Sequence, residues 1–161
     1  MSLIEKKLKE LNIVLPGKVK PTPLAEYVMT RLANGFLFVA GVCPLESCRP
    51  WITGQLVRDM KHEQGYEAAR IAAINVLAAA KEALGDLDRI SSVVKVVGYV
   101  ACDSDFYDQH MIVNGASHLF CDVFGERGKH VCSAVGVSTL PFHVPVMLEV
   151  IFSVDEAEGG L

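Results

Sequence analysis

The feature that most constrains the fold is an alanine-rich segment, EQGYEAARIAAINVLAAAKEAL, at residues 63–84. Its apolar residues recur at helical spacing, so the segment predicts one amphipathic helix that ends at Gly85. The apolar stripe consists of Tyr66, Ala69, Ala73, Val76, Leu77, Ala80 and Leu84. Because alanine side chains are short, a β-sheet can lie close against this stripe. We therefore expect a helix that packs along a sheet.

Several segments outside this helix have the composition of β-strands. Asn34 and Gly35 separate two β-prone runs, at about 27–32 and 36–42, and predict a hairpin. The valine-rich run ISSVVKVVGYVAC, at 90–102, is too apolar for an exposed edge and predicts a central strand. Two final strands flank the turn TLPFH and are expected near 131–138 and 144–154.

Helical and loop segments complete the expected order of elements. A short amphipathic helix is expected at 3–13, and an extended connector, LPGKVKPTP, follows at 15–23. Residues 43–61 predict a long exposed loop, in which Trp51 either caps the core or stacks on a ligand. A second long helix is expected within 103–125. The residues assigned to its apolar face are Met111, Val113, Leu119, Phe120, Val123 and Phe124.

This order of elements predicts an α+β fold, with two helices packed on one face of a mixed or antiparallel sheet. We expect a single domain over 1–161, in which 1–26 form the N-terminal helix and extended connector and 155–161 form a frayed tail. The two helices can cover only one face of the sheet. The other face would expose apolar residues unless another subunit covers it, so we expect an oligomer.

The composition narrows the classes of partner. Half of the residues (51%) are hydrophobic, and the formal net charge of −4 disfavours a nucleic-acid partner. No apolar run approaches the roughly 18 residues of a membrane span, and EKKLKEL near the start does not predict a secretory signal. The five cysteines show no CxxC spacing, and the five histidines show no paired-ligand spacing. We therefore expect free thiols in a reducing cytoplasm, no metal site and no cofactor.

The sequence also contains four separated blocks in a familiar order. They are FLFVAGVCP at 36–44, the segment from EQGYEAAR to VVKVVGYV at 63–100, FYDQHMIVNGASHLFCDVFGERGKH at 106–130, and SAVGVSTLPFHVPVMLEVIF at 133–152. With these blocks the chain resembles the YjgF/RidA family of reactive-intermediate deaminases, also labelled endoribonuclease L-PSP, and in particular its longer branch.

The resemblance implies a chorismate-mutase-like α+β fold and a homotrimer in which the sheets line a central barrel. It also implies clefts at the subunit interfaces for small ligands that bear a carboxylate. Family members hydrolyse enamines and imines, released by amino-acid-degrading enzymes, to keto acids and ammonia. An enzyme of this type would be a 2-iminobutanoate/2-iminopropanoate deaminase-like hydrolase.

Several positions of the family's site are occupied differently in this chain. The resemblance places a carboxylate-binding arginine at Cys132, whose thiol offers no fixed positive charge for bidentate binding. Of two family glutamates in the last strand, the first is replaced by Met147 and the second is retained as Glu149. Ala40 stands where the family has a hydroxyl, and Val42 stands where it has a glutamine. The site positions that keep the family residue are Tyr27, Gly41 and Asn114.

We therefore assign Glu149 and Cys132 as candidate catalytic residues. Cys132 is either a thiolate paired with His130, which would alternate onto the same strand face, or a small buried residue in the space left by an arginine. Glu149 either orients water at an imine carbon or forms a structural ion pair with Arg58, Lys95 or another subunit. The candidate substrate-binding residues are Tyr27, Ala40, Gly41, Asn114, Cys132 and Met147.

Three functions are consistent with this pattern. The first is a hydrolase with a rearranged site, which rests on Tyr27, Asn114 and Glu149, although Tyr27 and Asn114 also have ordinary structural interpretations. The second is a non-catalytic trimer that binds a neutral or apolar small molecule or a partner, which rests on the missing arginine. The third is a ribonuclease, which the acidic charge and the lack of a His–His or His–Lys arrangement disfavour.

Overall fold

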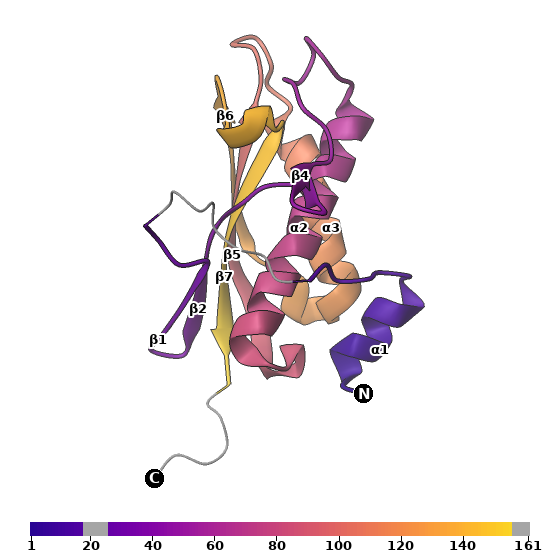
Figure 1. Cartoon of the computed structure of the whole chain (residues 1–161), viewed down its shortest axis with the longest axis vertical. Helices are drawn as coiled ribbons and strands as arrows, with labels where there is room; N and C mark the ends of the chain where they lie inside the picture. The colour runs from indigo at the N-terminus through magenta and orange to yellow at the C-terminus, as the bar shows by residue number, and fades with distance from the viewer. Residues whose placement is uncertain (18–25, 156–161) are drawn as a thin grey trace.

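The structure is a computed structural model that describes residues 1–17 and 26–155. Figure 1 shows a β-sheet with helices α2 and α3 packed on one of its faces. The helices are α1 (Leu3–Glu10), α2 (His62–Leu84) and α3 (Gln109–Phe124), with short 3₁₀ turns at Leu87–Arg89, Gly125–Gly128 and Pro141–His143. The strands are β1 (Thr30–Ala33), β2 (Phe36–Val42), β3 (Leu45–Glu46), β4 (Arg49–Pro50), β5 (Ile90–Ala101), β6 (Val131–Val137) and β7 (Val146–Val154). The predicted α+β class is confirmed.

The main sheet has the strand order β1-β2-β7-β5-β6 and is mixed, because β5 and β6 run parallel while the other neighbours are antiparallel. The valine-rich strand β5 lies between β7 and β6, so its prediction as a central strand is confirmed. The predicted hairpin joins β1 to β2. Asn34 and Gly35 have φ angles of 49° and 74°, which are the left-handed values that a two-residue turn requires and that these residues tolerate.

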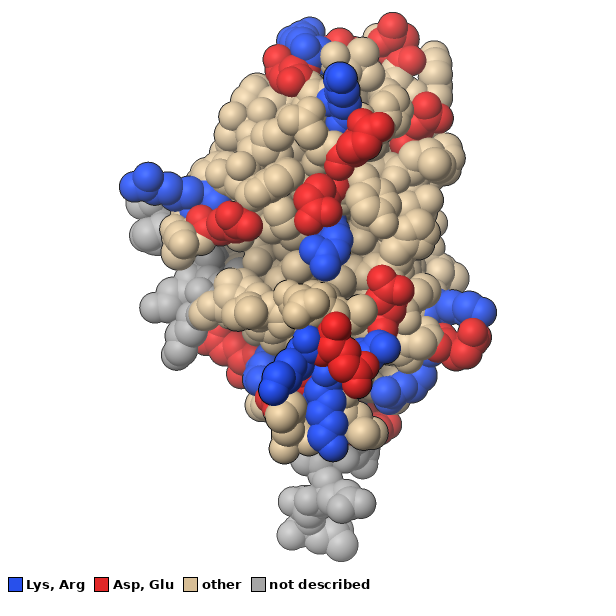
Figure 2. Space-filling view, turned by 90° about the vertical axis from the view of Figure 1, so that its right-hand side faces the viewer, with Lys and Arg blue, Asp and Glu red and all other residues tan. Residues whose placement is uncertain are grey.

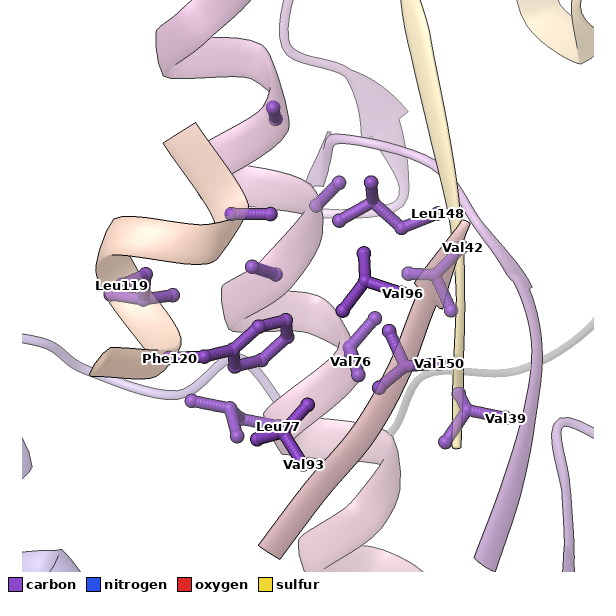
Figure 3. Packing of buried hydrophobic residues seen from close by; sticks show 14 of the residues in the cluster. Val39, Val42, Val76, Leu77, Val93, Val96, Leu119, Phe120, Leu148 and Val150 are labelled. Carbon is purple, nitrogen blue, oxygen red and sulfur yellow. The ribbon is translucent and has the colours of Figure 1, made fainter. Parts of the chain in front are cut away.

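The hydrophobic core fills the space between the sheet and helices α2 and α3. Figure 3 shows valines and leucines of β2, β5 and β7 pointing toward the two helices, with Phe120 of α3 among them. Five alanines of α2 are completely buried, which confirms that the helix uses its small residues to approach its neighbours: Ala68, Ala69, Ala72, Ala73 and Ala80. Gly85 ends α2 with a φ of 77°, as predicted.

Glycines set the distance between the packed elements. A Cβ atom on Gly115 of α3 would lie 2.0 Å from the backbone oxygen of Tyr66 in α2, and one on Gly98 of β5 would lie 2.3 Å from a methyl group of Val113.

Helix α1 is attached separately. The carboxylate of Asp88 accepts hydrogen bonds from the backbone amides of Leu3 and Ile4, at 2.7 and 2.8 Å. This contact caps the first turn of α1.

The structure differs from the sequence-based expectations at two places. Met111 was assigned to the apolar face of α3, but its side chain is exposed and Ile112 is buried instead. Residues 43–61 are not a wholly exposed loop, because they form the β3–β4 hairpin and bury Leu56 and Met60. Trp51 packs against the core, in agreement with the capping interpretation. Parts of the expected connector (18–23) and tail (156–161) lie outside the described residues.

The two outer surfaces of the molecule differ in chemistry. Figure 2 shows the helix side, where lysines and arginines alternate with aspartates and glutamates. On the uncovered face of the sheet, the exposed side chains include Phe36, Phe38 and Val135. The uncovered face is therefore the apolar surface that the sequence predicts.

Replacement of Gly115 by alanine should lower the free energy of unfolding by about 3 kcal/mol, because the added methyl group would overlap the backbone of α2. The matched control is Gly17→Ala, since no atom lies within 4 Å of that position. Urea unfolding followed by circular dichroism measures both. Equal stability of the two variants would contradict the close packing of α2 and α3.

Candidate functional site

Met147 and Glu149 of β7 lie on the uncovered face of the sheet. They alternate with Leu148 and Val150, which are buried in the core, so their side chains project to the opposite side. Ile151 follows the same alternation. Met147, Glu149 and Ile151 therefore share one face of the sheet.

An irregularity in β2 brings two further candidate residues to this surface. The pairing of β2 with β7 shifts between Val39 and Val42, and Ala40 and Gly41 lie within the shift. A Cβ atom on Gly41 would lie 2.8 Å from the sulfur of Met147, so glycine is what allows this methionine to rest against β2. Ala40, Gly41 and Met147 therefore lie together beside Glu149.

Glu149 accepts a hydrogen bond from a tyrosine that the sequence analysis did not single out. The Tyr99 hydroxyl of β5 lies 3.1 Å from Oε2 of Glu149. Burial raises the pKa of the Tyr99 phenol, and the hydrogen bond to Glu149 and its negative charge raise it further. Strand alternation could have placed Tyr99 and Lys95 on one face of β5, but the register between β5 and β7 was needed to place Tyr99 beside Glu149.

Within 1–17 and 26–155, neither Arg58 nor Lys95, the charged partners expected for Glu149, forms an ion pair with it. Arg58 pairs with Asp103, with 3.1 Å between Nη2 and Oδ1. Lys95 is paired in register with Ile151, while Val97 is paired with Glu149. Lys95 is therefore a diagonal neighbour of Glu149 on the same face of the sheet. Tyr99 is the other diagonal neighbour on β5.

Cys132 lies on the other side of the sheet from Glu149. It is paired in register with Val96, which is completely buried on the helix side, and paired residues project to the same face. Because β6 is an edge strand, Cys132 remains exposed. Partial burial of its sulfur raises the pKa of the thiol, so the group is protonated and neutral near pH 7.

His130 does not form a pair with this thiol. Its Nε2 atom lies 3.0 Å from the hydroxyl of Ser117, and its Nδ1 atom lies 2.7 Å from the carbonyl oxygen of Gly128. Lys129, the adjacent positive charge, forms an ion pair with Glu126 at 2.8 Å. The local geometry therefore provides no activation of Cys132 as a nucleophile.

Tyr27 and Asn114 occupy different parts of the molecule. Asn114 is half-buried on α3, the helix that covers the sheet on the Cys132 side, and its Nδ2 atom lies 4.0 Å from the sulfur of Met111. Tyr27 is 50% exposed and precedes β1. The segment that follows it is attached to β2, because the amide of Ala40 donates to the carbonyl oxygen of Met29 at 2.8 Å.

Apart from Tyr27, the candidate residues form two groups. The outer-face group consists of Ala40, Gly41, Met147 and Glu149, to which the structure adds Tyr99. The edge group consists of Cys132 of β6 and Asn114 of α3, a helix that contacts β6 on the covered side of the sheet. The sheet separates them, so one chain alone does not surround a ligand with both groups.

A depression beside α1 is lined by residues that include Glu5, Lys9, Ile13 and Lys81, away from both groups. Within 1–17 and 26–155, no set of three or more His, Cys, Asp or Glu side chains is placed to hold a metal ion. Among the same residues, no helix combines the length and apolar character needed to cross a membrane.

Comparisons with known proteins agree with this architecture. A family model described as YjgF/chorismate mutase-like, putative endoribonuclease, matches residues 10–153. Protein TCP17 of Trypanosoma cruzi is 38% identical over 143 residues, which cover 88% of each protein. The solved structure of Atu1372 from Agrobacterium tumefaciens has a TM-score of 0.87 at 40% identity, covering 95% of this chain and 94% of its own. A putative endoribonuclease from Shewanella oneidensis MR-1 has a TM-score of 0.89 at 24% identity, covering 95% of this chain and 100% of its own, which is a likeness of fold.

Proposed function

We propose that this chain, which belongs to the YjgF/chorismate mutase-like family, acts as a homotrimer. The homotrimer binds a small uncharged metabolite in clefts between its subunits. The observation that carries the choice of ligand is Cys132, a neutral thiol at the position where the family resemblance expects a carboxylate-binding arginine.

Two features of the single chain support assembly into a trimer. The uncovered face of the sheet exposes Phe36, Phe38 and Val135, which a second subunit would bury. The outer-face group and the edge group lie on opposite sides of the sheet, so contact of one ligand with both requires the edge strand β6 of one subunit to approach the outer face of another. This arrangement would give one cleft at each interface.

The ligand class follows from the charges that this cleft would contain. A guanidinium binds a carboxylate through two parallel hydrogen bonds, and a thiol replaces neither the charge nor the geometry. Ala40 and Met147 add apolar surface beside Glu149. A ligand without a carboxylate therefore suits the cleft better than a keto acid does.

A second candidate function, hydrolysis of imines formed from enamines, is favoured by the hydrogen bond between Tyr99 and Glu149. In this reaction the imine nitrogen takes a proton from solvent, and a water molecule adds to the iminium carbon while Glu149 accepts one of its protons and the C=N π electrons move to nitrogen. Glu149 then transfers that proton to the nitrogen of the carbinolamine. The C–N bond breaks with ammonia as the leaving group, and the hydroxyl proton returns to solvent as the keto product forms. Ribonuclease activity is a weaker third candidate, because the net charge of −4 opposes binding of RNA phosphates.

We further propose that the protein resides in the cytoplasm. All five of its cysteines are free thiols in the structure. Free thiols persist in a reducing compartment and are readily oxidised outside it.

Native mass spectrometry of the purified protein should give the mass of three chains of 17.5 kDa. The apolar outer face provides the reason, because exposure of Phe36 and Phe38 in a monomer is unfavourable. A monomer mass at micromolar concentration would contradict the proposed assembly.

Replacement of Cys132 by arginine should create binding of 2-oxobutanoate that the natural protein lacks, with an affinity gain of about tenfold or more from a charge-assisted hydrogen bond. Isothermal titration calorimetry measures the gain. Val14→Arg is the control, because it adds the same charge at a side chain that is 87% exposed. If the natural protein already binds 2-oxobutanoate tightly, the proposed ligand class is wrong.

Hydrolysis is tested with 2-aminopropenoate, generated in situ from L-serine by a dehydratase. If the second candidate is correct, the natural protein accelerates loss of this enamine over buffer, and Glu149→Gln removes most of the acceleration. No acceleration with precursors from several amino acids would eliminate this candidate.

A further inference from the structure

The outer face of the sheet carries an ordered series of side chains around Glu149. On β5 the series is Lys95, Val97 and Tyr99, and their register partners on β7 are Ile151, Glu149 and Met147. Glu149 therefore lies between a lysine on one diagonal and a tyrosine on the other. Diagonal neighbours on a sheet are within reach of long side chains, so both contacts are available to the carboxylate.

In the structure, Glu149 forms its hydrogen bond with the tyrosine. The Tyr99 hydroxyl donates to Oε2 of Glu149 at 3.1 Å, which holds the carboxylate toward the end of the sheet where Met147 rests against Gly41. The other oxygen, Oε1, has no part in this hydrogen bond. The remaining neighbours in this region, Val97 and Met147, are half-buried and apolar.

We infer that Tyr99 is a positioning residue for Glu149: its hydroxyl holds the carboxylate away from Lys95 and presents Oε1 to the ligand beside Met147 and Gly41. This inference rests on the proposed role of Glu149 as the group that accepts a proton from water. Without the hydroxyl, the glutamate is free to turn toward the Lys95 ammonium, and its oxygens then leave the position next to the ligand.

The geometry also explains why one oxygen is fixed and the other is available. A carboxylate that accepts a hydrogen bond at one oxygen keeps lone pairs on the second oxygen for another donor. An ion pair with Lys95 would instead make the carboxylate a weaker base for hydrolysis, because a neighbouring positive charge favours the ionised form. The phenol orients the carboxylate without supplying a positive charge, because the elevated pKa of Tyr99 keeps it protonated.

The test compares enamine loss, with 2-aminopropenoate generated from L-serine, for the full-length protein and the variants Tyr99→Phe, Glu149→Gln and the double variant. We expect Tyr99→Phe to lower kcat/KM by about tenfold, which corresponds to loss of one hydrogen bond to a charged group. We expect the double variant to match Glu149→Gln alone, because Tyr99 acts only through Glu149. Tyr107→Phe is the control, since that tyrosine is 79% exposed and lies outside the site.

Full activity of Tyr99→Phe would overturn the inference. The inference would also be overturned if the factor by which the double variant lowers kcat/KM equalled the product of the factors of the two single variants. If the natural protein does not accelerate enamine loss, the hydrolase proposal fails, and the contact is then judged by titration of ¹³C-labelled tyrosine. In that measurement Glu149→Gln should lower the pKa of Tyr99, while the surface control Glu10→Gln should leave it unchanged. An unchanged pKa of Tyr99 in Glu149→Gln would overturn the inference independently of activity.

Discussion

The structure depends on how closely the helix layer lies against one face of the sheet. The buried alanines of α2 and the contact of Gly115 with the α2 backbone bring the two helices together, and Gly98 lets α3 approach β5. Helices α2 and α3 both lie on this face (Figure 1). Since residues of a strand alternate between faces, half of the side chains of β5 and β7 project from the uncovered side. Tyr99 and Glu149 project from that side for this reason.

Local signals in the sequence were sufficient for helices α2 and α3 and for the strands of the main sheet, but not for the β3–β4 hairpin. Asn34-Gly35 predicted its hairpin, and Gly85 predicted the end of α2, because each depends on backbone conformations that few other residues accept. The error at Met111 has a simple cause. Met111 and Ile112 are both apolar neighbours, so helical periodicity alone could not choose which of them faces the core.

Long-range pairing could not be read from the sequence. The register of β5 against β7 decides that Glu149 lies beside Tyr99, and a shift by one residue would reverse the faces. The edge position of β6 decides that Cys132 is exposed instead of buried. Alternation along β7 accounts for the shared face of Met147 and Glu149. The sequence thus indicated the members of the two groups except Tyr99, but not their placement on opposite sides of the sheet.

In the proposed cleft, the absence of an arginine at position 132 and the presence of Glu149 would affect different parts of a ligand. In the proposed cleft, a carboxylate ligand would lose the attraction of a guanidinium and would still meet the negative charge of Glu149. Two unit charges 4 Å apart interact by about 4 kcal/mol at an effective dielectric constant of about 20, so this repulsion matters for binding. The reacting end of an imine is different, because it gains positive charge as its nitrogen is protonated, and Glu149 attracts that charge. An arginine at position 132 would contact the carboxylate of an imino acid in the ground state and in the transition state alike, so its absence weakens both to a similar degree. The two candidate functions therefore share one site and differ in the ligand, which is an uncharged metabolite in the first and an imine in the second.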